Sequence, residues 1–409
     1  MKKLWEKWHE ITLVTRIALG LVIGVVVGVV FPGASWLTIL GNLFVGALKG
    51  IAPLLVFVLV IASVANASNA VGHKMGKVLA LYILSTVLAA SCAVVASFLF
   101  PVSIRLTGVE AAANAAPGTL GEVVNNLLVN LVENPVSAIA NANYIGVLCW
   151  AIVIGLALKG LAADGTKSAI GELSDAVTQV VRWVIQFAPV GILGLVYTSV
   201  STNGLSIFLD YGKLLALLVG TLLFQALIVS PIMASLYIGR NAYPLLWICI
   251  KESSVTAFFT RSSAANIPVN MALCEKLGLD KDLYSVSIPL GATINMDGAA
   301  ITITIMTLAA ANTLGIQVSL SAAILLSLLA TVAACGSSGV AGGSLLLIPL
   351  ACSMFGIPNE IAMQVVGVGF IIGVIQDSFE TALNSAGDVL FASSAEFREW
   401  VKQGKPLPF

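Results

Sequence analysis

Long apolar runs dominate this chain, and short polar segments separate them. Six runs before residue 240 approach or exceed the length that crosses about 30 Å of hydrocarbon as a helix. Three more complex apolar regions follow between residues 244 and 394. The pattern predicts an all-α polytopic membrane protein, whose first spans are expected at residues 17–31, 43–65, 78–100, 144–158, 184–199 and 214–237.

A group of polar side chains interrupts the last apolar region. At about 100° per residue, Asp377, Glu380, Thr381, Asn384 and Asp388 share one face of a helix. A charge at the centre of a membrane costs about 2.5–3.5 kcal/mol on insertion scales, so charges kept there usually serve a function. This polar stripe therefore predicts a site or route for an ion or a polar solute.

Composition narrows the class of protein further. Hydrophobic residues make up 58% of the chain and charged residues 10%, whereas soluble domains carry about 25% charged residues. An ordinary cytosolic enzyme is therefore excluded, and no basic block with interleaved aromatics indicates a nucleic-acid partner. The cysteines lie singly, and the spans contain no Ser/His/Asp set or metal cluster, so we predict neither enzyme activity nor an organic cofactor.

Lysine and arginine positions predict the orientation of the helices, because cytoplasmic loops carry an excess of these residues. Basic residues lie on both sides of residues 255–273, so this segment is expected to return to the cytoplasm as a re-entrant hairpin turning near Arg261, Ser262 and Ser263. A second hairpin is expected to enter from outside and to turn at residues 336–344. With both termini cytoplasmic, the prediction is eight spans and two opposed hairpins.

Two hairpin tips inside the membrane predict a polar cavity, because unsatisfied backbone groups in hydrocarbon cost several kcal/mol each. Residues 293–298, Thr-Ile-Asn-Met-Asp-Gly, interrupt the apolar segment between the hairpins. Sodium is a hard cation that prefers oxygen ligands, and Asp297 and Asp388 are the natural carboxylates. Other oxygens are expected from Thr293, Asn295 and Asn384, with Gly291 and Gly298 letting the backbone turn so that its carbonyls face inward.

The chain offers a binding partner for each of the two fixed charges of an amino-acid substrate. Asp377 can accept hydrogen bonds from the ammonium group, and amides at the two hairpin tips can hold the carboxylate. Arg261 is basic and lies at the first tip, while Glu380 is an acid without an obvious cation. Pairing these two residues would offset the desolvation cost of both, so we predict that they form an ion pair.

Four segments resemble the dicarboxylate/amino acid:cation symporter family, which includes the glutamate transporters. They are Thr260-Arg261-Ser262-Ser263, residues 289–298, the glycine-rich second tip and residues 377–388. The resemblance implies an inverted-repeat fold in a bacterial inner-membrane homotrimer, with a fixed scaffold and a moving transport part. The scaffold is expected at about 12–66 and 143–200, and the transport part at about 78–100 and 211–394, with hairpin 1 at about 244–275 and hairpin 2 at about 321–356.

The resemblance also implies a role for individual residues. The implied substrate site consists of Ser262, Ser263, Val340, Gly342, Asp377, Glu380, Thr381 and Asn384. The implied sodium ligands are Gly291, Asn295, Asn384 and Asp388 for one ion, Thr293 with carbonyls of Ala334, Cys335 and Ser337 for a second, and Asn295 and Asp297 with Tyr82, Ser85 and Thr86 for a third.

Two departures from the family pattern affect the predicted function. Transporters of acidic amino acids commonly carry an arginine where this chain has Glu380, and a glutamate there would repel an acidic side chain. Ala299 stands where the family usually has threonine, which leaves the number of sodium ions open. We predict sodium-coupled symport of small neutral amino acids, L-serine and L-threonine, across the lipid bilayer. The alternatives are a proton- or sodium-coupled carrier of dicarboxylates or acidic amino acids with the same fold, and an ion channel.

Overall fold

The computed structural model describes residues 11–66, 73–106, 128–129, 131–337 and 342–409 of the chain. Every regular element in these residues is a helix, which confirms the predicted all-α class. Six described helices are long and apolar enough to cross a membrane, and a seventh is added if α9 (Asp164–Gln186) and α10 (Ala188–Asn203), bent by 53°, count as one. The six are Ser35–Asn66, Lys74–Leu99, Tyr144–Leu161, Ile207–Ile238, Lys281–Thr313 and Asn359–Lys402.

The first half of the chain supplies a group of helices that pack closely at small residues. A Cβ atom added to Gly20 would lie 2.1 Å from the carbonyl oxygen of Pro189, and one added to Gly24 would lie 2.7 Å from that of Leu193. Glycine therefore permits the close approach of α2 and α10. The group contains α2 (Leu13–Val30), η1 (Ser35–Leu37), α3 (Thr38–Asn66), α7 (Pro135–Ala140), α8 (Tyr144–Leu161), α9 (Asp164–Gln186) and α10 (Ala188–Asn203).

Hairpin 1 turns where the sequence predicts it. Its first limb ends at Arg261, which adopts a left-handed conformation with φ of 52°. The Ser262 side chain then caps the helix of the second limb by accepting a hydrogen bond from the amide of Ala265. The limbs are α13 (Tyr243–Cys249), the π-helical segment η3 (Ile250–Ser254), α14 (Val255–Thr260) and α15 (Ser263–Lys276).

The remaining helices include the predicted break and the polar stripe. One apolar segment is interrupted at Asn295 and Met296, between α16 (Lys281–Ile294) and α17 (Asp297–Thr313). Hairpin 2 consists of α18 (Leu320–Ala334), η4 (Ser344–Leu347) and α19 (Ile348–Met354), and the stripe lies on one continuous helix, α20 (Asn359–Lys402). The others are α4 (His73–Leu99), α11 (Ile207–Phe224), the π-helical segment η2 (Gln225–Val229) and α12 (Ser230–Ile238).

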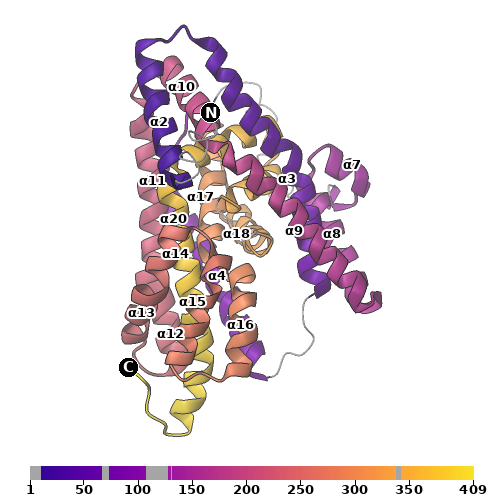
Figure 1. The fold of residues 1–409 in the computed structure, drawn as a ribbon, viewed down its shortest axis with the longest axis vertical. Coiled ribbons are helices and arrows are strands. Elements are labelled where there is room, and N and C mark those ends of the chain that lie inside the picture. The colour runs from indigo at the N-terminus through magenta and orange to yellow at the C-terminus, as the bar shows by residue number, and fades with distance from the viewer. Residues whose placement is uncertain (1–10, 67–72, 107–127, 130, 338–341) are drawn as a thin grey trace.

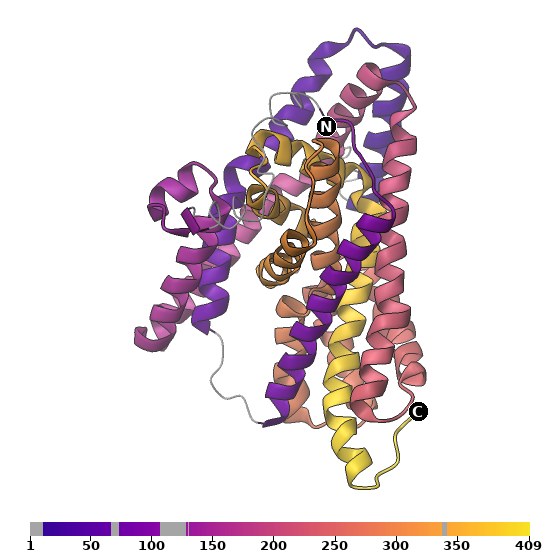
Figure 2. The same cartoon turned by 180° about the vertical axis from the view of Figure 1, so that it is seen from behind.

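Helix α20 runs along the long axis of the molecule and organises the second half of the chain. Figure 1 shows α3, α8 and α9 on one side of the molecule and α11, α12 and α13 on the other. From behind, α4 and α11 flank α20 (Figure 2), in agreement with the contacts between these helices. The stripe on α20 is therefore enclosed by helices that come from distant parts of the sequence.

Candidate functional site

The polar stripe on α20 is buried inside the protein. Asp377, Glu380, Thr381, Asn384 and Asp388 are each at most 5% exposed to solvent. Buried charged and amide groups require partners, because an unsatisfied one loses its hydration without compensation. The partners come from hairpin 1, hairpin 2, α4 and the break between α16 and α17, so each part of the stripe contacts a different element.

The helix break lies directly against the middle of the stripe. The side-chain amide of Asn295 donates to the carbonyl oxygen of Asn384 at 3.1 Å and to Oδ1 of Asp388 at 3.0 Å. The backbone N–H of Gly298, which has no partner within the first turn of α17, donates to Oδ1 of Asn384 at 2.7 Å. The break therefore exposes backbone and side-chain groups that the stripe binds.

Two glycines allow this close contact. A Cβ atom at Gly291 would lie 2.6 Å from Oδ1 of Asp388 and 2.9 Å from the hydroxyl of Tyr82. One at Gly298 would lie 2.8 Å from Cγ of Glu380. Both glycines lie within regular helices, so the prediction that they turn the backbone is wrong, and what they provide is room for the neighbouring helices.

The region around Asp388 fits a sodium ion by the chemistry of its atoms. Oδ2 of Asp388 and Oδ1 of Asn295 are buried, and neither accepts a hydrogen bond within the described residues. Tyr82 donates to the carbonyl oxygens of Asp388 at 3.0 Å and Ser287 at 3.3 Å. Two neighbouring buried oxygens without donors, one of them a carboxylate, are of the kind that a hard cation prefers as ligands.

A second polar cluster surrounds Asp297 at the start of α17. Its carboxylate accepts hydrogen bonds from Ser85, from Thr86 at 3.0 Å and from the amide of Gln225 at 3.1 Å. The structure thus brings together three of the residues implied for the third sodium site, whereas Tyr82 bonds near Asp388 instead. Gln225 was not predicted from the sequence, although a lone amide in the middle of an apolar run was a signal for it.

The residues implied for a second sodium ion lie on two separate elements, α16 and hairpin 2. The hydroxyl of Thr293 donates to the carbonyl oxygen of Leu290 in its own helix. Cys335, beside the buried Ala334 and Ser337 of hairpin 2, contacts the carbonyl oxygen of Ile294 at 3.6 Å. Hairpin 2 therefore reaches the broken helix beside Thr293. Val340 lies outside the described residues.

Arg261 pairs with Asp377, so the predicted pairing with Glu380 is wrong. The Nε atom of Arg261 lies 2.7 Å from Oδ2 of Asp377, and both side chains are at most 9% exposed. The backbone of Gly342 also bonds to Asp377, and the hydroxyl of Thr381 donates to the Asp377 carbonyl at 2.8 Å. Asp377 therefore joins the first tip, where Ser263 is also buried, to the second tip.

Glu380 bonds to neutral donors, and no cation pairs with it in the part of the chain that the structure describes. Its Oε2 atom accepts hydrogen bonds from Thr302 at 2.7 Å, from Ser344 at 2.9 Å and from the amide of Gln376. None of these three partners was predicted from the sequence. Gln376 could have been found, since it lies four residues before Glu380 and therefore on the same face of α20.

The model of the sodium:dicarboxylate symporter family matches residues 13–396 of the chain. The chain belongs to this family. Membership in this symporter family confirms the resemblance carried by the two tips, the broken helix and the stripe, and it identifies the chain as a membrane transporter.

Full-length relatives of this family member carry a more specific name. The chain is 59% identical to the serine/threonine transporter SstT of Bifidobacterium adolescentis, over 98% of the chain and 93% of the relative. It is 51% identical to a protein of the same name from Streptococcus thermophilus, over 98% of the chain and 100% of the relative. A Streptococcus agalactiae protein of that name is 55% identical, over 97% of the chain and 98% of the relative.

Hairpin 1 of the symporter is fixed to α20 by a buried group of small polar side chains. Ser253, Asn266, Asn270 and Ser385 are each fully buried. The amide of Asn270 donates to the hydroxyl and the carbonyl oxygen of Ser385, both at 3.0 Å, and the amide of Asn266 donates to the Ser385 hydroxyl at 2.7 Å. This cluster was not predicted from the sequence, although asparagines four residues apart on one helix were a signal for it.

Proposed function

We propose that this symporter takes up small neutral amino acids, L-serine and L-threonine, together with sodium ions. The observation that carries the proposal is the environment of Glu380. This buried acid lies one turn from Asp377 and bonds to hydroxyl and amide groups, and within the described residues no cation pairs with it. An acidic substrate side chain would meet a like charge there, whereas a hydroxyl group would meet an acceptor. The names of the full-length relatives support the same substrates.

The amino group of the substrate binds at Asp377 in this proposal. A carboxylate has about four acceptor positions, so Asp377 can hold both Arg261 and an ammonium group. The substrate carboxylate lies near Ser262, Ser263 and Asn384, with Val340 and Gly342 contributing from the second tip. Thr381 borders the same space on α20.

Sodium is the coupling ion, and it binds at the buried oxygens described above. When bound, it neutralises carboxylate charge in the transport part of the protein. Asp388 and Asn295 hold one ion with oxygens of Gly291 and Asn384, and the cluster of Asp297, Ser85 and Thr86 with Tyr82 and Asn295 holds another. The broken helix supplies these groups without exposing them to lipid. A further ion is proposed at Thr293 and the carbonyls of Ala334, Cys335 and Ser337.

The proposed architecture contains eight spans and two opposed re-entrant hairpins. Residues of about 12–66 and 143–200 form the scaffold, and residues of about 78–100 and 211–394 form the transport part. We propose that hairpin 2 is the outer gate, and that the chain forms a homotrimer in the bacterial inner membrane with both termini in the cytoplasm. In Figure 1, α3, α8 and α9 of the proposed scaffold lie apart from α12 and α13 of the proposed transport part, which supports this division.

Uptake by purified protein in proteoliposomes tests the function. We expect an inward sodium gradient to drive accumulation of labelled serine, with threonine competing and aspartate and succinate not competing. Serine uptake that ignores sodium and follows a proton gradient would contradict the coupling. Strong competition by aspartate or succinate would favour the dicarboxylate carrier, and current without substrate would favour a channel.

A further inference from the structure

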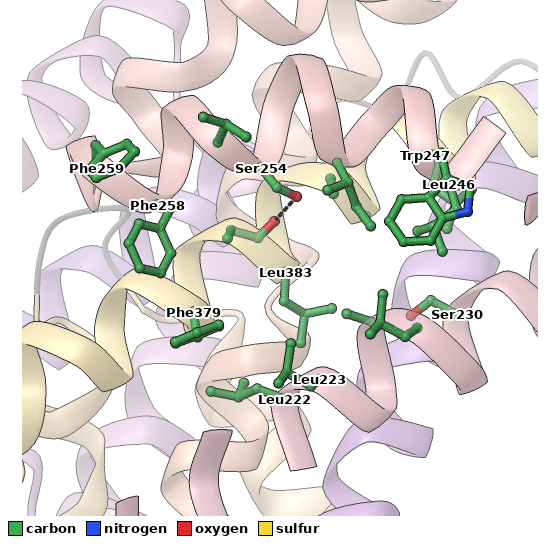
Figure 3. A pocket seen from close by; sticks show the side chains of 18 residues that line it. Leu222, Leu223, Ser230, Leu246, Trp247, Ser254, Phe258, Phe259, Phe379 and Leu383 are labelled. Atoms are coloured by element: carbon green, nitrogen blue, oxygen red, sulfur yellow. Dashed lines mark hydrogen bonds between the residues drawn. The ribbon is translucent and has the colours of Figure 1, made fainter. Parts of the chain in front are cut away.

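An apolar cavity of about 350 Å³ lies behind the polar stripe. Three parts of the chain line it, namely α11 to α12, hairpin 1 and the segment of α20 from Phe379 to Leu390. Figure 3 shows aliphatic and aromatic side chains from these elements around a common space. One of its hydrogen-bonding groups, the hydroxyl of Ser254, is used internally, because it donates to the Ala382 carbonyl at 3.0 Å.

The rim of the cavity is exposed and apolar. Phe259 is 76% exposed, Trp247 is 59% exposed and Leu223 is 39% exposed. In a membrane transporter, large apolar side chains exposed on the surface of the spanning helices face the acyl chains of the bilayer. The cavity therefore opens toward lipid and has the chemistry of an acyl-chain site.

One end of the cavity differs from the other in polarity. Figure 3 shows Phe258, Phe259 and Phe379 at one end, and Ser230, Leu246 and Trp247 at the other. The Ser230 side chain is nearly fully buried, and its hydroxyl has no hydrogen-bond partner among the described residues. An unpartnered buried hydroxyl is costly, so this end favours a ligand that carries an acceptor.

Two basic residues follow, along the chain, segments that line this end of the cavity. Arg240 lies two residues after the end of α12, in the turn that leads to α13, and Lys251 directly follows Ile250, which lines the cavity. Both side chains belong to exposed residues, and neither forms an ion pair in the part of the chain that the structure describes. Basic residues near a membrane surface attract anionic lipid. Tryptophan at this end is also typical of the level of the lipid headgroups.

We propose that this cavity binds one acyl chain of an anionic glycerophospholipid. The chain extends from Trp247 toward Phe258 and Phe379. The ester carbonyl accepts a hydrogen bond from Ser230, and the phosphate lies near Arg240 and Lys251. The hydroxyl, the apolar space and the two cations thus match successive parts of a single molecule.

The bound acyl chain contacts the same elements that hold the substrate. Phe258 lies against Phe379 with ring centroids 5.1 Å apart, and three residues later Arg261 reaches Asp377. A lipid chain packed against both aromatic rings therefore holds hairpin 1 on α20. We expect lipid at this site to raise the unfolding temperature of the transporter and to increase its rate of uptake.

The test compares binding of phosphatidylglycerol and phosphatidylcholine to the detergent-purified, full-length protein by native mass spectrometry. Ala382→Phe places a ring in the cavity and is expected to weaken phosphatidylglycerol binding at least about 10-fold by excluding the chain. The matched control is Ala216→Phe, since Ala216 lines a different apolar groove between α4 and α11. This control should bind lipid as the wild type does.

Two further variants test the polar end. Ser230→Ala removes the hydroxyl donor, and we expect affinity to fall by about 5-fold for both lipids. Replacing both Arg240 and Lys251 by glutamine should remove the preference for phosphatidylglycerol while leaving phosphatidylcholine binding unchanged. Wild-type protein that binds both lipids equally would overturn the headgroup assignment.

A second measurement locates the chain if Ala382→Phe fails to fold. Phosphatidylglycerol with a photoreactive group on its acyl chain is incorporated into liposomes with the wild-type protein, and crosslinked peptides are identified. We expect crosslinks in α13, α14 and the segment of α20 that contains Phe379. Crosslinks confined to α4 and α11 would overturn the proposal, as would lipid binding that Ala216→Phe abolishes and Ala382→Phe leaves intact.

Discussion

Hairpins 1 and 2 both reach the polar stripe, yet they are held against the protein in different ways. Hairpin 1 is fixed along its length by the cluster of Ser253, Asn266, Asn270 and Ser385, and at its tip by the ion pair of Arg261 with Asp377. In hairpin 2, the described residues between Ser344 and Met354 are almost all buried and apolar. The polar links from hairpin 2 to α20 include the hydroxyl of Ser344, which donates to Glu380, and the backbone of Gly342 at the tip, which bonds to Asp377.

This difference gives a physical reason for separate roles. Apolar contacts are not directional, so a hairpin held by them can shift and re-form its contacts at low cost. Buried polar networks are directional, and opening one leaves several donors and acceptors unsatisfied at once. The contrast supports hairpin 2 as the proposed gate and hairpin 1 as the fixed side of the substrate site.

The ion pair at the tip of hairpin 1 should have the largest effect on stability. Arg261→Gln leaves Asp377 buried without its cation, and we expect the free energy of unfolding to fall by about 3–5 kcal/mol. Thermal unfolding in detergent measures this change. The double variant Arg261→Gln/Asp377→Asn should recover part of the loss, whereas Arg261→Gln/Glu380→Gln should not. Recovery only with the Glu380 variant would restore the pairing that the structure excludes.

A substitution in the proposed sodium site should reduce transport, independently of how the two hairpins are held. Asp388→Asn removes a carboxylate charge from the proposed ion site, and we expect sodium-driven serine uptake to fall on the order of 100-fold, or about 2.7 kcal/mol. The exposed Asp175→Asn on α9 is the matched control and should transport normally. Uptake in Asp388→Asn with unchanged sodium dependence would exclude Asp388 from the ion site.

The polar cluster of hairpin 1 should contribute less than the ion pair. Asn270→Leu removes both donors to Ser385 and the acceptor for Ser253. We expect a loss of about 2 kcal/mol in stability, because buried partners remain unsatisfied. The exposed Asn141→Leu serves as the control for the change of residue type. Equal stability of the two variants would show that the cluster does not fix hairpin 1.

The hydroxyl bond of hairpin 2 should have the smallest effect. Ser344→Ala leaves Glu380 bonded to Thr302 and Gln376, so we expect a loss of only about 1 kcal/mol in stability. Transport should become faster if release of this bond accompanies gate opening. Ser321→Ala, at the exposed start of hairpin 2, is the control. A loss larger than that of Asn270→Leu would reverse the comparison between the hairpins.

The sequence predicted the positions of the stripe, the helix break and the first tip, because polar groups inside apolar runs are conspicuous. It did not predict the partner of Arg261. Spacing along a helix shows that Asp377 and Glu380 share a face, but it does not show which of them lies level with a tip from another part of the chain. Glu380 also looked unpartnered because its donors, Thr302, Ser344 and Gln376, are common neutral residues.

Gln225 and the asparagines of hairpin 1 were missed for a related reason. A single amide in an apolar run fits many harmless positions, and only the packing of α11 against α4 and α17 shows that Gln225 faces Asp297. The role of Gly291 was wrong because sequence indicates backbone freedom but does not reveal that Asp388 approaches its Cα. These contacts depend on the relative depth of helices, which a one-dimensional pattern does not contain.

The π-helical segments η2 and η3 determine in which direction the side chains on either side of them point. A π-turn accommodates one more residue than an α-turn, so η2 and η3 each behave like a one-residue insertion in an α-helix. Deleting one residue from η2 would leave the helix intact but rotate everything on one side of it by about 100°. Gln225 and Ser230, which now face the ion cluster and the apolar cavity, could then no longer both keep their directions. Chain length at this point is therefore as strictly constrained as the identity of the residues.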